Sequence, residues 1–498
     1  MSTFIALVPI AVIAFLLLAL RMPSQLASAA VWALTAALCV LPTPFHMDWR
    51  RCADASLYAL VLALPIVVVL AFGALLYQLL SLTGAMGALA DRVACTFADK
   101  VVSALFISAA LGTGFEWASG FGLGIVMVAP LYRMLGFSPA QIVQLSLLTQ
   151  FWIPWGAYGA SSMATSELTG MPLQDLASDS ALVGWPLAVM YLCLIAVIAH
   201  GWKGLRARWF IVLVSAALMG SVTWAVSRWL DPTTAGGCAA VALGVLLWWH
   251  GRRWRLDERS RDTGTGPRLT LWRVMSPYAL VVAYLAVVNE IPGLHRRLAE
   301  WMTWSVPNYA TRVSFLLSPG VALLFACLLA VGLLGLRGQR WHLCIQAVRH
   351  TSRQVWRTLF ATVAFMETSS WMAKSGMFHV LALDLARLGV IAVLVASPVL
   401  AALGGLMAGT STASNAMLAP LQVQMAHIAH LPVVIFAVAQ NVASAQAAYI
   451  APSRIAFATS FVNEQGREGG YMRRLAPWST LAVSWVALAD LLMWVCHK

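Results

Sequence analysis

Long apolar runs separated by short polar loops cover this chain from its first residues to its last. A helix that crosses a membrane needs about 20 predominantly apolar residues. The runs that approach this length lie at about residues 3–20, 26–44, 56–80, 181–201, 209–229, 234–250, 274–291, 314–336, 358–373 and 476–496. Together with two interrupted elements, they predict an all-α polytopic membrane protein with about 12 transmembrane helices.

One apolar segment, at about residues 101–135, is interrupted where a continuous lipid-facing helix is not expected. The interruption is Gly112-Thr-Gly-Phe-Glu-Trp-Ala-Ser-Gly-Phe-Gly-Leu-Gly124, which holds five glycines and one carboxylate. Irregular backbone at membrane depth is tolerated only where protein buries it or where it lines a wet cavity. We therefore predict a re-entrant hairpin here, the first hairpin, whose tip (residues 112–124, the first tip) holds half of a transport site.

A second broken segment, at about residues 389–428, has the same organisation. Its interruption is the polar stretch Gly409-Thr-Ser-Thr-Ala-Ser-Asn415. We predict a second hairpin, with residues 409–415 as the second tip. A long interrupted element follows each hairpin, at 138–168 and at 431–460.

Short sequence matches relate the two halves of the chain. Pro130-Leu131 and Pro420-Leu421 end the two broken segments and lie 290 residues apart, as do Gln150 and Gln440 in the elements that follow. If each hairpin returns to its own side, an odd number of crossings separates the starts of the two repeats, so the repeats are inverted. Inverted repeats with paired interrupted helices are typical of secondary transporters.

This reading divides the chain into three parts. The first inverted repeat covers residues 1–201, two linking helices and a basic loop cover 202–273, and the second repeat covers 274–498. The loop at 251–273 is the most basic in the chain, and the positive-inside rule assigns it to the cytoplasm. Both termini then lie outside.

The composition agrees with a membrane protein. Hydrophobic residues make up 61% of the chain and charged residues 10%, against roughly 25% charged in soluble domains. The net charge of +13 comes from Lys and Arg in short loops, so we do not expect nucleic-acid binding. The eight cysteines form no CxxC, and the chain has no metal-ligand spacing and no phosphate-cradling loop. We expect no metal, no cofactor and no ATP-driven step.

Two carboxylates in apolar surroundings are candidate proton carriers. Glu116 lies in the first tip, and Glu367 lies in the crossing at 358–373. Carboxylates inside a membrane are costly, and they usually face the bundle interior or a wet cavity. The alternative for Glu116 is structural: its carboxylate caps a short helix by accepting backbone N–H bonds.

Small polar residues of the tips and amides of the interrupted elements are the candidate substrate ligands. Free N–H groups at helix starts suit a carboxylate, although small residues also serve helix packing, and the amides could instead pair with one another. The candidates are Thr113, Ser119, Gly120, Gly122, Gln150, Thr412, Ser414, Asn415, Gln440 and Gln446.

Two large side chains near the tips each have two possible roles. Arg454 could bind a carboxylate in bidentate fashion, but the sequence favours snorkelling toward the cytoplasmic surface. Trp117, beside Glu116, could shape the cavity, but the sequence favours packing against the core or lipid.

At these same stretches the chain resembles the lactate permease family. The family pattern L-E-G-A-x-G-F-G-x-P is similar to residues 115–124, with matches at Glu116, Ala118, Gly120, Phe121 and Gly122. It departs at Trp117 and Gly124. The second family signature, S-G-S-x-T-x-S-N, is similar to residues 408–415, with matches at Gly409, Thr412, Ser414 and Asn415.

The resemblance implies proton symport of a small organic anion, such as lactate or glycolate, across the plasma membrane of a bacterium. By analogy with related transporters it also implies a homodimer and an elevator motion of residues about 100–168 and 389–460. Sodium coupling, with a different carboxylate as the substrate, is the alternative. A membrane-embedded enzyme is disfavoured because the hydroxyl-rich tips lack a histidine partner, and a channel is disfavoured because paired hairpins suit alternating access.

Overall fold

In the computed structural model, the described residues are 2–16, 20, 22–82, 99–119, 122–252, 341–464 and 467–496, with parts of 276–333. The predicted connector at 85–100, except for its last two residues, and most of the basic loop at 251–273 lie outside them. So does much of the predicted crossing at 274–291.

The described helices of the first half run from the N-terminus to the predicted basic loop. They are α1 (Ser2–Ala14), α2 (Ser24–Val40), α3 (Trp49–Leu82), α5 (Lys100–Leu105), a π-helix η2 (Phe106–Gly112), α6 (Thr113–Ser119), α7 (Leu123–Met134), α8 (Pro139–Leu147), the 3₁₀ turns η3 (Leu148–Gln150), η4 (Ile153–Trp155) and η5 (Ala157–Gly159), α9 (Ala160–Thr169), α10 (Leu173–Trp229) and α11 (Ala235–Arg252).

The second half is mostly helical. Its described elements are α13 (Pro292–Glu300), the antiparallel strands β1 (Thr303–Ser305) and β2 (Arg312–Ser314), α14 (Pro319–Leu333), α15 (Trp341–Lys374), α16 (Met377–Ala386), α17 (Val390–Ala408), α18 (Ser411–Ile428), α19 (Val433–Ala448), α20 (Pro452–Ser460) and α21 (Glu468–Cys496). The short β1–β2 ribbon departs from the all-α prediction.

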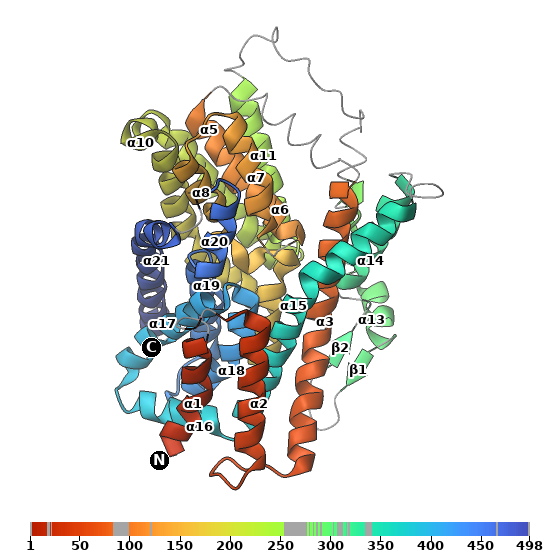
Figure 1. Cartoon of the computed structure of the whole chain (residues 1–498), viewed down its shortest axis with the longest axis vertical. Coiled ribbons are helices and arrows are strands. Elements are labelled where there is room, and N and C mark those ends of the chain that lie inside the picture. Colours follow the sequence, from red (N-terminus) through yellow and green to blue (C-terminus); the bar gives the residue numbers. More distant parts are fainter. Residues whose placement is uncertain are drawn as a thin grey trace.

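Both predicted hairpins are pairs of helices that fold back on each other. In the first, Tyr132 of α7 donates from its hydroxyl to the Ala104 carbonyl of α5 at 3.1 Å. In the second, Gln422 of α18 donates to the Ser397 carbonyl of α17 at 3.1 Å. Figure 1 shows α5–α7 in the upper half of the view and α17–α18 in the lower half, so the two hairpins approach each other from opposite ends of the molecule.

The elements after the hairpins are interrupted. A capping box of Ser138 and Gln141 starts α8, which gives way to the three 3₁₀ turns before α9 begins. The second interruption, Tyr449–Ala451, separates α19 from α20, and Pro452 opens α20 at a position where a missing N–H costs nothing. Each break leaves backbone groups free of the helical ladder near a hairpin tip.

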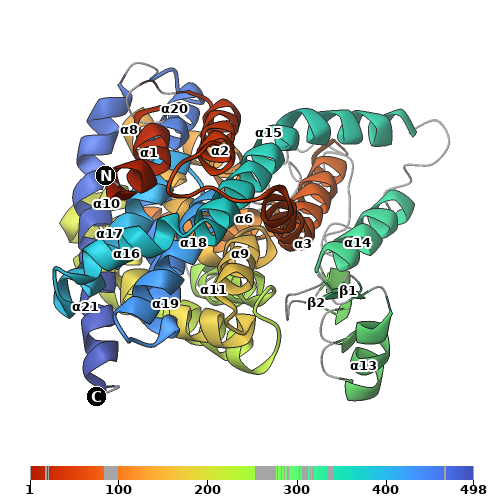
Figure 2. The same cartoon turned by 90° about the horizontal axis from the view of Figure 1, so that it is seen from below.

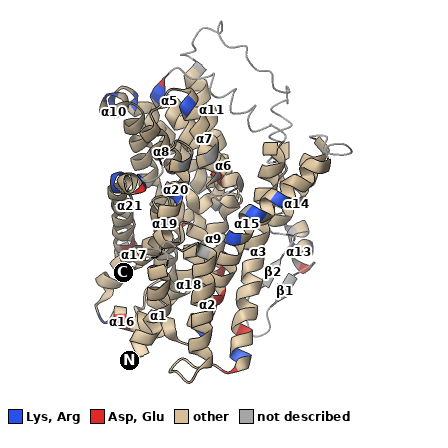
Figure 3. Ribbon diagram, in the orientation of Figure 1, with Lys and Arg blue, Asp and Glu red and all other residues tan. Residues whose placement is uncertain are grey.

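Six described helical segments are long and apolar enough to cross a membrane, and five further apolar helices are shorter. Figure 3 shows few Lys, Arg, Asp or Glu residues along the ribbon of the main bundle. Seen from below, α13, α14, β1 and β2 form a flank beside α3 and the main bundle (Figure 2). These features match a helical membrane protein.

Helix boundaries differ from the apolar windows at several places. The predicted crossings at 181–201 and 209–229 belong to one element, α10, whose backbone kinks at His200, Gly201 and Arg208. Likewise, α15 begins at Trp341, seventeen residues before the predicted start of the crossing at 358. Apolar windows end at charged residues, whereas backbone hydrogen bonding continues through them, so composition marks the crossing but not the helix.

Candidate functional site

Arg454, near the start of α20, lies between the two hairpin tips. Its Nε donates to the Gly409 carbonyl of the second tip at 2.7 Å. Its Nη1 lies against Gly122 of the first tip, so close that a Cβ added there would stand 2.3 Å away. The expectation that Arg454 snorkels to the surface is therefore wrong: the break before α20 turns its side chain inward, where it touches both tips.

The two glycines that contact this region have left-handed backbones. Gly122 has φ +79° and Gly409 has φ +66°, conformations that favour glycine. A Cβ on Gly409 would lie 2.6 Å from the Ser453 hydroxyl, just as one on Gly122 would meet Arg454. The glycines thus let the start of α20 approach both tips at once.

Glu116 folds over the start of α7 and accepts three hydrogen bonds. Its Oε1 accepts from the Gly122 amide at 3.3 Å, and its Oε2 accepts from the Gly124 amide at 3.4 Å and from Gln150 Nε2 at 2.7 Å. These donors suit the carboxylate form, which also complements the positive end of α7. This is the geometry of the capping alternative. Glu116 is 5% exposed.

Glu116 and Arg454 flank the same backbone position from two sides. The carboxylate interacts electrostatically with the guanidinium, and no direct ion pair joins them among the described residues. We call this region, formed by Glu116, Gly122, Gly409 and Arg454, the junction. It holds one buried carboxyl group and one partly buried guanidinium group that lie close together without a direct ion pair.

The polar residues of the second tip face inward, into a hydrogen-bonded network. Asn415 donates to Ser161 Oγ of α9 at 2.9 Å and accepts from Gln440 at 3.1 Å and from Ser444 at 2.9 Å. Ser414 accepts from Gln440 at 3.2 Å. These five residues are buried. The amides pair with neighbours, so the network connects the second hairpin to both interrupted elements.

A smaller set of side chains remains accessible at the junction. Arg454, Thr410 and Thr412 are partly exposed and Ser453 is exposed, whereas Gln150 Oε1 is buried without a hydrogen-bond partner. A guanidinium with hydroxyl-bearing residues next to it in the chain can bind a small carboxylate that also carries a hydroxyl group. No group of three His, Cys, Asp or Glu residues that could hold a metal ion occurs in the described part of the chain.

Other predicted residues are engaged elsewhere or lie outside the description. Thr113 donates its hydroxyl to the Ala109 carbonyl one turn earlier in its own helix. Gln446 donates to the Phe151 carbonyl at 3.4 Å. Gly120 and the side chain of Ser119 lie outside the described residues.

Glu367 is not part of the junction. It is 6% exposed on α15 and interacts with Ser56 of α3 and with Trp371 one turn away. One of its carboxylate oxygens, Oε2, has no hydrogen-bond partner. The structure therefore separates the two predicted proton carriers and brings only Glu116 to the tips.

Trp117 points away from Arg454 and packs against α11. Its indole N–H donates to the Thr233 carbonyl at 2.8 Å, its ring lies 4.6 Å from that of Tyr158, and a Cβ on Gly237 would collide with it. Trp152 and Trp155 stack on each other at 4.8 Å. Packing, rather than contact with a ligand, accounts for these three side chains.

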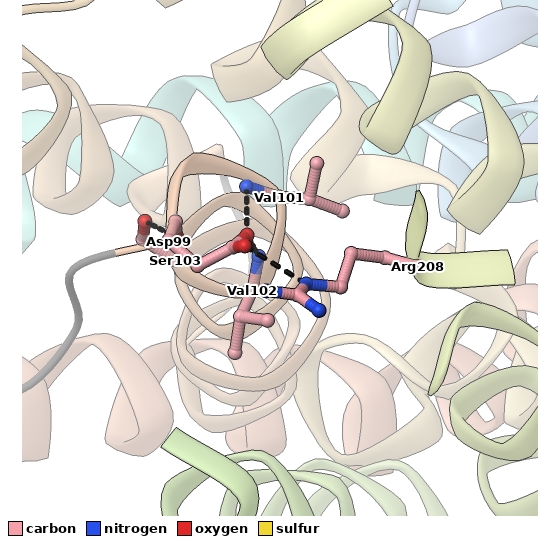
Figure 4. Close-up of polar contacts among 5 residues, drawn as sticks. All are labelled: Asp99, Val101, Val102, Ser103 and Arg208. Carbon is pink, nitrogen blue, oxygen red and sulfur yellow. Dashed lines mark hydrogen bonds and ion pairs between the residues drawn. The ribbon is translucent and has the colours of Figure 1, made fainter. Parts of the chain in front are cut away.

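The base of the first hairpin is attached to α10 (Figure 4). Asp99 caps α5 by accepting from the amides of Val101 at 2.8 Å and Val102 at 3.0 Å, and it pairs with Arg208 at 2.9 Å. Burial alone would raise the pKa of Asp99, but these hydrogen bonds and the guanidinium charge outweigh it and lower the pKa below its usual value. The cap holds the hairpin base beside the kink in α10.

Sequence reasoning missed several members of the polar network. Asn441 donates to Ser162 and to Ser180, both at 3.0 Å, and Ser161 bonds to Ser411 at 2.7 Å. The density of Ser and Asn in 161–162 and 441–444 was visible in the sequence. Which of these side chains form hydrogen bonds with each other depends on how helices that are far apart in the chain cross.

The sequence of this chain is similar to those of known permeases. The L-lactate permease family model matches residues 2–306 and 297–495. The L-lactate permease of Salmonella typhimurium is 25% identical over 521 residues, covering 95% of this chain and 92% of that protein. The glycolate permease GlcA of Escherichia coli is 24% identical over 547 residues, covering 99% and 95%.

A solved structure is similar in fold. The YdaH transporter of Alcanivorax borkumensis, whose crystal structure has an unusual topology, matches with a TM-score of 0.51 and 15% identity over 95% of this chain and 98% of that one. At this identity the match supports the fold alone. It agrees with the helical transporter architecture predicted from the sequence.

Proposed function

The chain belongs to the L-lactate permease family, and from this premise we propose that it imports a small hydroxylated monocarboxylate, such as lactate or glycolate, by proton symport. It is a multi-pass bacterial membrane protein and a transporter of small organic acids rather than an enzyme. The observation that carries the proposal is Arg454, a cation in contact with both hairpin tips.

In the proposed mechanism, Arg454 binds the carboxylate of the substrate. Ser453, next to Arg454 in the chain, and Thr412 of the second tip, which are both accessible, hydrogen-bond the substrate hydroxyl. A single cation matches one carboxylate, so a dicarboxylate would bring a second charge without a partner. Ser414, Asn415 and the amides around them hold the second tip in place instead of touching the substrate.

Glu116 supplies the proton coupling in this proposal. While it is ionised, its charge partly neutralises Arg454 across Gly122. Protonation removes that charge and releases the guanidinium field for the incoming anion. One proton and one anion then move together, so the membrane potential does not oppose entry of the anion.

In the proposed transport cycle, a motion of the hairpins exposes the junction to each side of the membrane in turn. The two hairpins are re-entrant, and they move with the interrupted helices α8–α9 and α19–α20 as one transport unit. The Asn415 network connects the second hairpin to α9 and α19, and Gln150 connects Glu116 of the first tip to the element after it. The remaining helices form the scaffold and the homodimer contact. This is the elevator arrangement.

Uptake by proteoliposomes tests the substrate and the coupling. We expect accumulation of labelled L-lactate or glycolate when the outside is acidic, no requirement for Na⁺ when choline replaces it, and loss of concentrating uptake in Glu116→Gln. Uptake that ignores the pH gradient, or a strict need for Na⁺, contradicts proton symport. Glu464→Gln, at a partly exposed pair with Arg467 outside the junction, is the matched control.

A further inference from the structure

Asp490 is a buried carboxyl on α21 that the proposed mechanism does not use. It is 0% exposed, and both carboxylate oxygens lack a hydrogen-bond partner. Its neighbours on the helix face outward: Leu488 is 47% exposed and Leu492 is 51% exposed. Asp490 therefore belongs to the inner face of α21 and does not point into lipid.

The inner face of α21 is a regular stripe that packs on the transport elements. Its buried residues before Asp490 recur at helical spacing: Tyr471, Leu475, Ser479, Ala482, Val486 and Ala489. Ser479 donates to the Gln446 carbonyl of α19 at 2.6 Å, and Trp485 donates to the Val183 carbonyl of α10 at 2.9 Å. α17 is the other main neighbour of α21. Asp490 thus lies at an interface with the second hairpin and the interrupted helix after it.

Among the described residues, no side chain forms a hydrogen bond with Asp490. The sequences of α17, α19 and α8, which pack on α21, contain no titratable residue. On α20, the charged group is Arg454, which is engaged at the tips. On α10, Tyr191 packs on Tyr449. The acidic and basic residues of α10 are Asp175 and Asp179 in its first two turns (one to two turns before Val183), His200, Lys203, Arg206 and Arg208 around its kinks, and Arg228 in its last turn. None of these groups hydrogen-bonds to Asp490.

An ionised carboxylate without a partner is strongly disfavoured in such surroundings, whereas the neutral acid is tolerated far better. We propose that Asp490 is a proton-binding site: its carboxyl holds a proton while α21 is packed on α17 and α19, and it releases that proton when these helices separate. This inference does not depend on which substrate the protein carries or on the role of Glu116.

Infrared spectroscopy of the purified protein at about pH 7 tests the bound proton, because a protonated carboxyl has its own C=O stretch. We expect Asp490→Asn to remove one such band, with Glu116→Gln leaving that band in place. Glu468→Gln, on the first turn of the same helix and partly exposed, is the control and should not remove it. A spectrum of Asp490→Asn that matches the parent in this region overturns the proposal.

A second measurement tests the link to packing. If the packed state holds one proton more than the separated state, the packed state loses about tenfold in relative population for each pH unit above the ordinary range of aspartate. The unfolding midpoint of the parent should therefore fall more steeply between about pH 6 and 8 than that of Asp490→Asn. Equal slopes in the two proteins contradict the release step, whether or not lactate is transported.

Discussion

Replacing Arg454 by glutamine tests the junction most directly. The change removes the cation between the tips and the Nε bond to Gly409, which measures 2.7 Å. Truncating one partner of a desolvated charge pair costs about 2–5 kcal/mol, and each 1.4 kcal/mol is a factor of about ten in affinity. Taking about 3 kcal/mol for a partly exposed site, we expect KM for lactate to rise about 100-fold.

Arg454→Lys separates charge from geometry. Lysine keeps the positive charge but cannot make the planar Nε contact with Gly409, so we expect a smaller loss, about tenfold, from one charge-assisted hydrogen bond. The assay is initial uptake of labelled lactate into proteoliposomes over a range of concentrations, with protein orientation and amount measured in each preparation. Cell-surface expression alone would not distinguish binding from folding.

Arg133 provides the matched control. It also donates to a backbone carbonyl, that of Phe461, at 2.6 Å, but it lies at an exposed position. Arg133→Gln should leave KM within about twofold, as exposed charges contribute little. The reasoning is refuted if Arg454→Gln also keeps KM within about twofold. It is refuted as well if the effects of Arg454→Gln and Glu116→Gln simply add, because interacting charges should couple.

Three further changes follow from the structure. Gly122→Ala should abolish uptake, since the new Cβ would meet Arg454 at 2.3 Å. Gly136 also has a positive φ, but a Cβ added there would have no atom within 4 Å. Gly136→Ala should therefore lose only about 1 kcal/mol of stability. Asn415→Ala should lower stability by about 2–3 kcal/mol by leaving several buried polar groups unpaired, which thermal unfolding in detergent would detect. Asp99→Ala should cost about 1 kcal/mol at pH 7 through the lost cap. Folding lowers the pKa of Asp99, so the contribution of its carboxylate to stability is present above about pH 3.8 and is lost as the pH falls through the folded pKa. The stabilities of the parent and of Asp99→Ala should therefore converge in acid. An acid-independent difference would contradict that account.

The sequence by itself determined the class of protein and the position of its irregular segments. Apolar length identifies membrane helices because the hydrocarbon core sets a minimum span. Glycines and hydroxyls at 112–124 and 409–415 identify the two breaks, because a lipid-facing helix does not tolerate such stretches. The family was also predicted from these two tips, and the family model confirms it over the whole chain.

Only the tertiary structure decided which side chains meet. Periodicity along one helix does not state which row of another helix it crosses, so Arg454 could be assigned to the surface or to the site until the break before α20 was seen to turn it between Gly122 and Gly409. Likewise, Asn415 is saturated by partners on α9 and α19, more than two hundred residues apart in the chain. Asp490 gave no signal in a window of leucines, because its burial depends on the packing of α17 and α19 against one face of α21. Local composition decides what can enter a membrane, and the crossing of distant helices decides where its few charges lie.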